Sequence, residues 1–234
     1  MPTSTKNREP KKKKVINYKS CFDIIGPIMI GPSSSHTAGA IAIGEVANKL
    51  FHGKPKKAII KFYESFAATH KGHGTDYATM SGILGFATND PRVPNALEIA
   101  EKKGIEYEII EMDGTSPVGH ANTSCINLID DDHEIHVTGI SVGGGTIEVK
   151  YIEIDGFTLE PQGTLPILLA ITTDESLKPE LEKKLKENNV KINIITRYAQ
   201  NDKFLFQFDL DSQPPKALKN ELTNYNTKDK IILL

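Results

Sequence analysis

The chain has 234 residues, of which 38% are hydrophobic and 25% are charged, and its formal net charge is −2. This length is enough for one large or two ordinary domains with hydrophobic cores. The small net charge gives no reason to expect nucleic acid, and no apolar run approaches a membrane span. The composition therefore predicts a soluble globular protein with neither a nucleic-acid nor a membrane partner.

Residues 1–15 are polar and contain the basic run Lys11-Lys12-Lys13-Lys14. They lack the apolar core of a signal peptide, so we expect a disordered basic tail on a cytoplasmic protein. Contact between this tail and an acidic partner is the alternative. The two cysteines, Cys21 and Cys125, are too few to hold a zinc ion or an iron–sulfur cluster alone, which fits a reducing compartment.

A loop with two Gly-Pro steps precedes the first predicted helix, in residues 26–40, Gly-Pro-Ile-Met-Ile-Gly-Pro-Ser-Ser-Ser-His-Thr-Ala-Gly-Ala. Proline and glycine hold this backbone in a shape that neither a helix nor a strand continues. Helical periodicity follows over 37–51. Ser35, His36 and Thr37 therefore lie around a helix N-terminus, where free N–H groups and the helix dipole favour an anion. We predict a carboxylate or phosphate site; the alternative is an ordinary capping loop.

A second polar segment follows a strand predicted over 57–66. Within the polar segment 67–78, two glycines flank His73 in what we expect to be a loop, and Thr75 or Asp76 can cap a helix that continues to about Phe86. His73 is either a proton-handling residue oriented by Asp76 or Thr75, or a structural histidine.

A third polar turn, which contains His120, Asn122 and Thr123, stands just before an apolar run. The acidic triplet at 130–132 could bind calcium, but it lacks the ligand spacing of an EF-hand, so we predict a solvated hairpin tip. The predicted elements around these turns are a helix over 94–103 and strands over 105–111, 125–129, 136–142 and 147–154.

A run of three glycines, Gly143, Gly144 and Gly145, separates the last two of these strands. Such a run lets backbone approach a phosphate or carboxylate closely, or it forms a bulge in a hairpin. A phosphate loop for pyridoxal phosphate is a rival interpretation. No lysine lies in a context typical of that cofactor's anchor, so we expect no pyridoxal phosphate.

The C-terminal part has a different pattern, in which strands and helices alternate as βαββαβ within about 70 residues, the order of a ferredoxin-like module. We therefore predict an α+β protein with a first domain over 16–156 and a second over 163–234, joined by a linker within 155–163. The expected elements of the second domain are strands over 165–172, 190–198, 203–210 and 230–234 and helices over 177–187 and 213–225.

Four blocks in one order carry a family resemblance: Phe22–Ala40, Lys71–Asp76, His120–Thr123 and Ser141–Gly145. Over residues 18–160 the chain resembles the β chain of iron–sulfur-dependent L-serine dehydratase, and the C-terminal module is similar to the ACT domain that ends such chains. Two departures are visible. Ala121 stands where the family commonly has proline, and the module lacks the Pro-Gly turn with which many ACT domains hold an effector.

The resemblance implies a lyase made of two chains that converts L-serine to pyruvate and ammonia in amino-acid catabolism and gluconeogenesis. The α subunit would carry the cysteines of a [4Fe–4S] cluster, and this chain would bind no metal. A hetero-oligomer is expected, with a further β-chain dimer through the ACT-like domain.

The same resemblance assigns the polar residues to one substrate site for L-serine. His73 and His36 are the candidates for proton transfer, with His73 the first choice. The hydroxyl groups at the helix N-terminus would hold the substrate carboxylate. The complete set of expected substrate-binding residues is Ser33, Ser34, Ser35, His36, Thr37, Thr75, Asp76, His120, Asn122, Thr123, Gly143, Gly144 and Gly145.

Two other functions remain open at this point. The chain could be a non-catalytic, amino-acid-sensing regulatory subunit, although a sensor needs one carboxylate grip and not three histidine-bearing segments. A Ser-His hydrolase is the other alternative. Against it, no nucleophile elbow is present, and we expect the adjacent Ser35 and His36 side chains to point in different directions.

Overall fold

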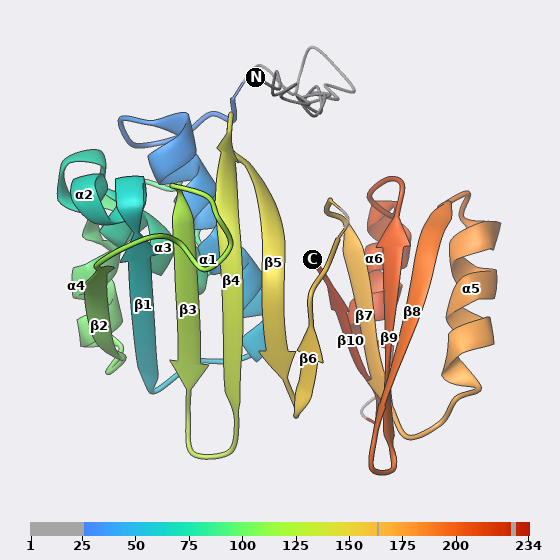
Figure 1. Cartoon of the computed structure of the whole chain (residues 1–234). Coiled ribbons are helices and arrows are strands. Elements are labelled where there is room, and N and C mark those ends of the chain that lie inside the picture. The colour runs from blue at the N-terminus through green and yellow to red at the C-terminus, as the bar shows by residue number, and fades with distance from the viewer. Residues whose placement is uncertain (1–25, 163, 226–227) are drawn as a thin grey trace, which may run out of the picture.

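The structure, a computed structural model, describes residues 26–162, 164–225 and 228–234, which form two β-sheets that each carry helices on one face (Figure 1). This is the α+β arrangement that the sequence predicts. The predicted basic tail, Cys21 and the beginning of the first family block lie outside the described residues. Within the described ranges, no helix is both long and apolar enough to cross a membrane.

The first sheet has six strands in the order β2-β1-β3-β4-β5-β6. β1 and β2 are parallel, and all other neighbours are antiparallel. The bounds are β1 (Lys57–Tyr63), β2 (Glu106–Met112), β3 (Thr123–Ile129), β4 (Glu134–Gly143), β5 (Thr146–Ile154) and β6 (Phe157–Leu159).

Helices cover one face of this sheet and leave the other face uncovered by helices (Figure 1). Alternate strand residues such as Ile60, Phe62 and Ile126 are fully buried, and they share one hydrophobic core with Ile43 and Leu50 of α1. The helices are α1 (Gly39–Phe51), α2 (Glu64–His73), α3 (Thr75–Ile83) and α4 (Ala96–Lys102), with a 3₁₀ turn η3 (Val93–Asn95) before α4.

The second unit has the predicted βαββαβ order and a four-stranded antiparallel sheet, β10-β7-β9-β8. Its helices cover one face, and the opposite face packs against the first unit, because Leu169 and Leu205 belong to the same hydrophobic cluster as α1 and β6. The bounds are β7 (Ile167–Thr172), α5 (Leu177–Glu187), β8 (Ile192–Gln200), β9 (Lys203–Leu210), α6 (Lys216–Thr223) and β10 (Lys230–Leu233).

Two sequence-based expectations about elements are wrong. β1 ends at Tyr63, and the polar segment before Thr75, which we expected to be a loop, is largely helical, so His73 lies at the end of α2. The turn from strand to helix occurs at Glu64, which adopts a φ of +45° that a non-glycine residue rarely takes. The predicted linker contains β6, because Asp155 and Gly156, both with positive φ, form a hairpin turn after β5.

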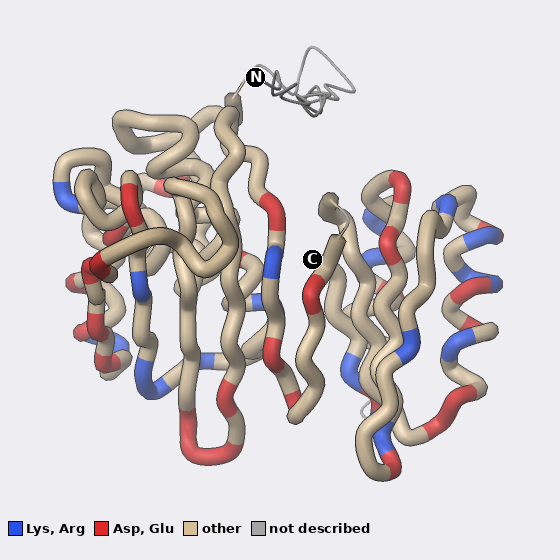
Figure 2. Tube along the Cα trace, in the orientation of Figure 1, with Lys and Arg blue, Asp and Glu red and all other residues tan. Residues whose placement is uncertain are grey.

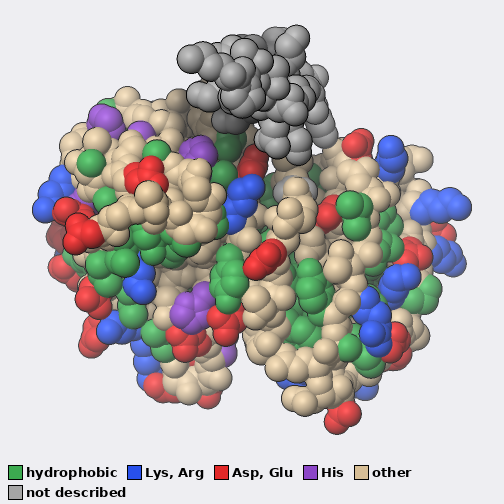
Figure 3. Space-filling model, viewed as in Figure 1, with side chains coloured by type: hydrophobic (Ala, Val, Ile, Leu, Met, Phe, Trp, Pro, Cys, Tyr) green, Lys and Arg blue, Asp and Glu red, His purple; other side chains and the backbone are tan. Residues whose placement is uncertain are grey.

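Charged residues are frequent at the β2 edge of the first sheet and on α5 of the second unit (Figure 2). The helix-free face of the first sheet shows apolar side chains among scattered charges (Figure 3). The polar turns of the sequence analysis lie elsewhere, at one end of this sheet.

The crossing of α1 and α3 provides a test of the packing. A Cβ added to Gly82 would lie 2.1 Å from the Ile41 carbonyl oxygen, so these helices approach as closely as glycine permits. Gly82→Ala forces them apart, and we expect a loss of about 1–3 kcal/mol in the free energy of unfolding, measured by chemical denaturation. Gly72→Ala is the matched control, because nothing lies within 4 Å of its added Cβ. Equal stability of the two variants would contradict this packing.

Candidate functional site

The register of the first sheet brings the polar segments to one end of the molecule. Tyr63 at the end of β1 pairs with Thr123 at the start of β3, and Thr123 pairs with Ile140 near the end of β4. The segments that follow β1, precede β3 and follow β4 therefore meet at one edge of the sheet, beside the N-terminus of α1. This convergence defines the candidate site.

A short π-helical turn, η2 (Ser34–Ala38), opens α1. Ser33 caps it: the Ser33 Oγ accepts a hydrogen bond from the His36 N–H at 3.2 Å, and the Ser33 carbonyl accepts one from the Thr37 N–H at 2.8 Å. The capping alternative of the sequence analysis is thus correct for Ser33. The carbonyl of Ser34 accepts the N–H of Gly39 and joins the turn to α1.

His36 is held on both sides of its imidazole ring. The Ser35 Oγ lies 2.9 Å from Nδ1, and the Ser65 Oγ lies 3.0 Å from Nε2. The rings of His73 and Phe66 stand 4.8 and 5.2 Å away, centroid to centroid. Burial and, secondarily, the charge of His73 lower the pKa of His36 below its ordinary value. His36 is therefore a neutral, fixed imidazole at neutral pH.

The expectation that the adjacent Ser35 and His36 side chains point in different directions is wrong. In the widened turn η2 the Ser35 hydroxyl reaches back to the neighbouring ring. A serine-histidine pair alone does not make a hydrolase, because Nε2 faces Ser65 and not a carboxylate that would complete a triad.

The second polar segment touches the first through a backbone contact and a ring contact. The Thr37 hydroxyl donates to the His73 carbonyl at 3.1 Å, while the His73 ring meets His36 edge to face. The expected partnership of Asp76 with His73 is wrong: the Asp76 carboxylate lies 3.8 Å from Nδ1 of His70 and accepts the N–H of Tyr77. The cause is the helical form of α2, which places His70 under the first turn of α3.

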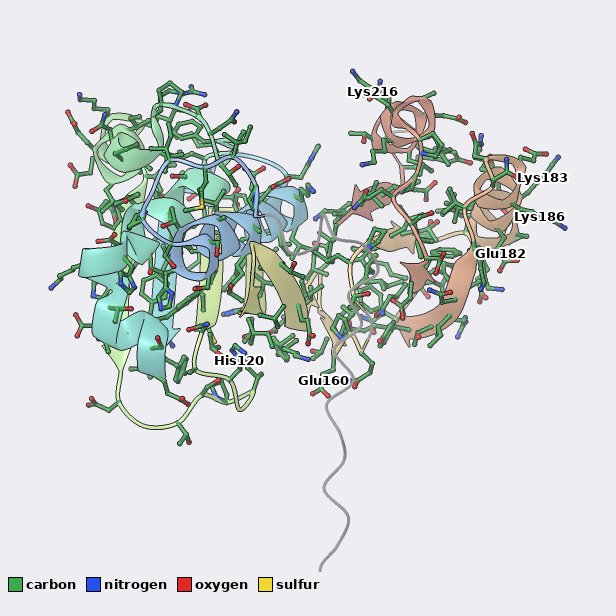
Figure 4. The ribbon with its side chains drawn as sticks, turned by 90° about the horizontal axis from the view of Figure 1, so that it is seen from above. His120, Glu160, Glu182, Lys183, Lys186 and Lys216 are labelled. Atoms are coloured by element: carbon green, nitrogen blue, oxygen red, sulfur yellow. The ribbon has the colours of Figure 1, made fainter. Side chains whose placement is uncertain are left out.

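The third polar turn joins the site through Asn122. The Asn122 side chain donates to the Ser141 carbonyl at 3.3 Å, and its own carbonyl accepts the Ser141 N–H. His120 is turned toward its own loop, because its Nδ1 accepts the Asn122 N–H and its carbonyl accepts the Thr123 hydroxyl. Figure 4 shows His120 on the loop that leads to β3. The structure therefore assembles His36 with His73, and leaves His120 outside this pair.

The triple glycine forms the hairpin turn between β4 and β5, with a register shift between Ser141 and Gly143. The bulge interpretation is therefore correct, and all three glycines have positive φ. This turn also meets the opening loop: a Cβ on Gly145 would lie 2.9 Å from Pro27 and 3.5 Å from Ala38. The hairpin therefore closes one side of the candidate site.

Three buried hydroxyl groups around this end of the sheet have no hydrogen-bond partner among the described residues, those of Thr75, Ser124 and Ser141. Buried polar groups in proteins are nearly always satisfied by protein, water or ligand. A polar guest or bound water would complete their hydrogen bonds.

Ser65 and Glu64 are the two residues that the sequence analysis missed. The Glu64 carboxylate accepts the N–H of Ser116 at 2.8 Å and thereby anchors the segment that leads to the third polar turn. Its positive φ aims Ser65 at His36. A polar Glu-Ser pair after an apolar strand was the available signal, but the predicted extension of β1 concealed it.

The described residues do not fit the role of iron–sulfur cluster ligands. Cys125 lies among Lys61, Asn127 and Tyr151 in a hollow lined by strand residues, and its thiol accepts a hydrogen bond from Thr138. Burial raises the pKa of this thiol, which disfavours the thiolate that binds metal. Within the described ranges, no group of three or more His, Cys, Asp or Glu side chains could hold a metal ion.

Comparison with known protein families decides the affiliation. Residues 20–151 match the family of the serine dehydratase beta chain. The chain belongs to this family. The matched range contains all the polar segments that meet at the candidate site.

The relatives include both short and long proteins. The chain is 50% identical over 160 residues to the probable L-serine dehydratase beta chain of Bacillus subtilis, covering 68% of this chain and 71% of that protein. It is 34% identical over 197 residues to the L-serine dehydratase beta chain of Peptoniphilus asaccharolyticus, covering 79% and 87%. It is 26% identical over 200 residues to the L-serine dehydratase of Helicobacter pylori strain 26695, covering 74% of this chain and 41% of that protein.

The histidine pair gives a pH-dependent prediction. Because the pKa of His36 is lowered in the folded state, the unfolded chain takes up this proton first as the pH falls. The contribution of His36 to the free energy of unfolding is thus fully present above pH 6.5, the ordinary pKa of the side chain. It is lost as the pH falls through the lower pKa of the folded state. Nuclear magnetic resonance should show a titration midpoint for His36 below 6.5, which His73→Gln raises.

His136→Gln is the control for this titration, because His136 pairs with Glu134 at the far end of β4. It should leave the midpoint of His36 unchanged. A midpoint that does not respond to His73→Gln would contradict the electrostatic contact between the two rings.

Proposed function

We propose that this chain is the β subunit of a [4Fe–4S]-dependent L-serine dehydratase, which converts L-serine to pyruvate and ammonia together with an α subunit. Membership of the beta-chain family and two relatives named beta chains of L-serine dehydratase support the proposal. The main supporting observation is that His36, held by hydrogen bonds to Ser35 and Ser65, contacts the His73 ring at a helix N-terminus. Such a position would place a proton acceptor beside a site for the substrate carboxylate.

The length of a longer relative and the apolar side chains exposed near the site support the need for a second chain. The Helicobacter pylori protein, named an L-serine dehydratase, matches this chain over only 41% of its own length. The rest of that protein lies outside the match, and we propose that an α subunit supplies it. Two of the large apolar side chains exposed to solvent, Ile28 (83% exposed) and Val142 (46% exposed), stand on the opening loop and at the end of β4 beside the site. Apolar side chains at the rim of a site suit a protein partner.

The proposal assigns the cluster to the α subunit. The burial of Cys125, which raises the pKa of its thiol, supports this assignment, and Cys21 lies outside the described residues. In this proposal the cysteines of the partner supply the ligand set of the cluster.

The first task of these residues is to hold the substrate. A carboxylate at the N-terminus of η2 would meet free backbone N–H groups and the positive end of the helix dipole. Ser34 stands next to Gly26 in the opening loop, at the entrance of this turn. Ser33 and Thr37 instead hold the turn together through the hydrogen bonds described above.

The second task is proton transfer. Dehydration removes the Cα proton and expels the β-hydroxyl as water; the aminoacrylate becomes an imine, which water hydrolyses to pyruvate and ammonia. Both ring nitrogens of His36 are engaged by hydroxyls. No side-chain hydrogen bond of His73 is found within the described part of the chain, so its ring is better placed to accept the proton. His36 then acts as a positioning residue for His73 through their ring contact.

The C-terminal unit is proposed to be an ACT-like domain that joins two β subunits. Its strand order places β8 at a free edge, and Ile194 on that strand is 57% exposed. An exposed edge strand pairs readily with a second strand. The cytoplasm is the proposed location.

Reconstitution tests the function. The chain is mixed anaerobically with a cluster-bearing α subunit, and pyruvate formed from L-serine is measured for the pair and for each chain alone. We expect activity from the pair only. Activity from this chain alone would contradict the two-chain proposal, and inactivity of a pair with an intact cluster would favour the amino-acid sensor.

Substitutions in the reconstituted enzyme separate the roles. His73→Gln should lower kcat by at least about 100-fold, the usual contribution of a general base. Ser65→Ala leaves His73 in place and releases one side of His36, so we expect a smaller loss of kcat and an altered pH profile. His136→Gln is the control for both. A wild-type pH profile and kcat for Ser65→Ala would rule out a positioning role.

A further inference from the structure

A second histidine of α2, His70, lies one turn before His73. Its side chain is only 7% exposed, and its ring stands 5.7 Å from the Phe62 ring, centroid to centroid. The Nε2 atom of His70 lies 2.8 Å from the Glu111 carboxylate on β2. This hydrogen bond is the main cause of the lowered pKa of Glu111. His70 therefore connects the last turn of α2 to the edge strand of the first sheet.

The other nitrogen of the His70 ring faces α3. This Nδ1 atom is buried without a hydrogen-bond partner among the described residues, and it lies 3.8 Å from the Asp76 carboxylate. A neutral imidazole can donate to one carboxylate only, whereas an imidazolium has an N–H for each of two. Lys71 adds a second cation 3.8 Å from Glu111. His70 thus stands between carboxylates that belong to two different elements, β2 and α3.

The turn between α2 and α3 is also fixed through its backbone. The Gly74 N–H donates to the His70 carbonyl, and Gly74 takes a left-handed φ of +68° that ends α2. The Tyr77 ring lies directly against Gly74, because a Cβ at Gly74 would stand 2.1 Å from that ring. The His73 carbonyl accepts the Thr37 hydroxyl from the other side. The position of His73 therefore depends on how the last turn of α2 is held.

We propose that His70 is a positioning residue for His73. Through Glu111 and Asp76 it holds the last turn of α2 against β2 and α3, so that the His73 ring keeps its contact with His36. The catalytic consequence rests on the proposed function, in which His73 accepts the Cα proton. The structural contact between His70 and the position of His73 can be tested without it.

Kinetics of the reconstituted enzyme test the catalytic consequence. His70→Leu removes both interactions of the ring, and we expect kcat to fall about 10- to 100-fold, because a catalytic group displaced by about 1 Å loses about that much rate. KM should change less than kcat, since the substrate carboxylate is proposed to bind at η2. His70→Gln, whose amide can still donate to Glu111, should recover part of the lost kcat. A wild-type kcat in His70→Leu, or equal losses in both variants, would overturn the proposal.

A titration of the chain by itself tests the structural contact. Glu111→Gln changes a side chain that is 58% exposed, so it serves even if His70→Leu fails to fold. Loss of a negative charge would by itself lower the titration midpoint of His36. Displacement of His73, whose charge lowers the pKa of His36, would raise that midpoint. We therefore expect nuclear magnetic resonance to show a rise toward the value of His73→Gln, and an unchanged or lower midpoint would contradict the proposal.

Glu108→Gln is the matched control, because it removes the same charge from β2. Glu108 lies three positions before Glu111 and therefore on the opposite face of the strand. This variant should keep the wild-type kcat and should not raise the midpoint of His36. A wild-type pair without activity would contradict the proposed function and leave the titration result intact. A raised midpoint in Glu111→Gln together with a wild-type kcat in His70→Leu would reject the positioning role.

Discussion

The turn η2 at the start of α1 is the point on which the candidate site depends. Every neighbouring segment packs on it at short range: Gly31 leaves room for the Thr37 side chain, Gly39 for the Ser141 hydroxyl, and Gly145 lies against Pro27 and Ala38. A Cβ on Gly31 would stand 2.3 Å from Thr37, so even one added methyl group would displace the turn. Glycines are needed here because side chains of the neighbouring segments lie directly against the backbone at these positions.

The architecture explains why such a crowded site is stable. The antiparallel pairing of β1, β3 and β4 brings three loops to one end of the sheet. The close glycine contact between α1 and α3 fixes the position of α1, whose first turn is the fourth segment of the site. Strain is concentrated at Glu64, whose positive φ costs about 1–2 kcal/mol for a residue with a side chain. The hydrogen bond from Ser116 to its carboxylate offsets part of this cost and fixes Ser65 beside His36.

The sequence predicted correctly the bounds of elements that have a strong hydrophobic periodicity and clear turn residues at their ends. α5 and β9 have the predicted bounds, and the six-element order of the second unit is as expected. The proximity of His36 to His73 agrees with the single site that the family resemblance implies. The errors have a common cause, since Glu64 and Asp155 both take positive φ without being glycine, and a propensity argument has no signal for that.

The side-chain contacts within the site were less predictable from the sequence than the location of the site. Asp76 was expected beside His73 from their spacing in the sequence. Because α2 is helical, His70 is the histidine that lies beside Asp76 of α3. Ser65 could not be identified as a neighbour of His36, because 29 positions separate them and only the tertiary fold joins them.

The central claim is that the turn η2 holds the substrate carboxylate while His73 faces the Cα proton. A structure of the reconstituted two-chain enzyme with L-alanine, which has no β-hydroxyl to lose, tests it most directly. The account predicts carboxylate oxygens within hydrogen-bond distance of the N–H and hydroxyl groups of Ser34 and Ser35, with Cα next to the His73 ring. An amino acid bound at the active site with its carboxylate on the partner chain, away from this turn, would contradict it.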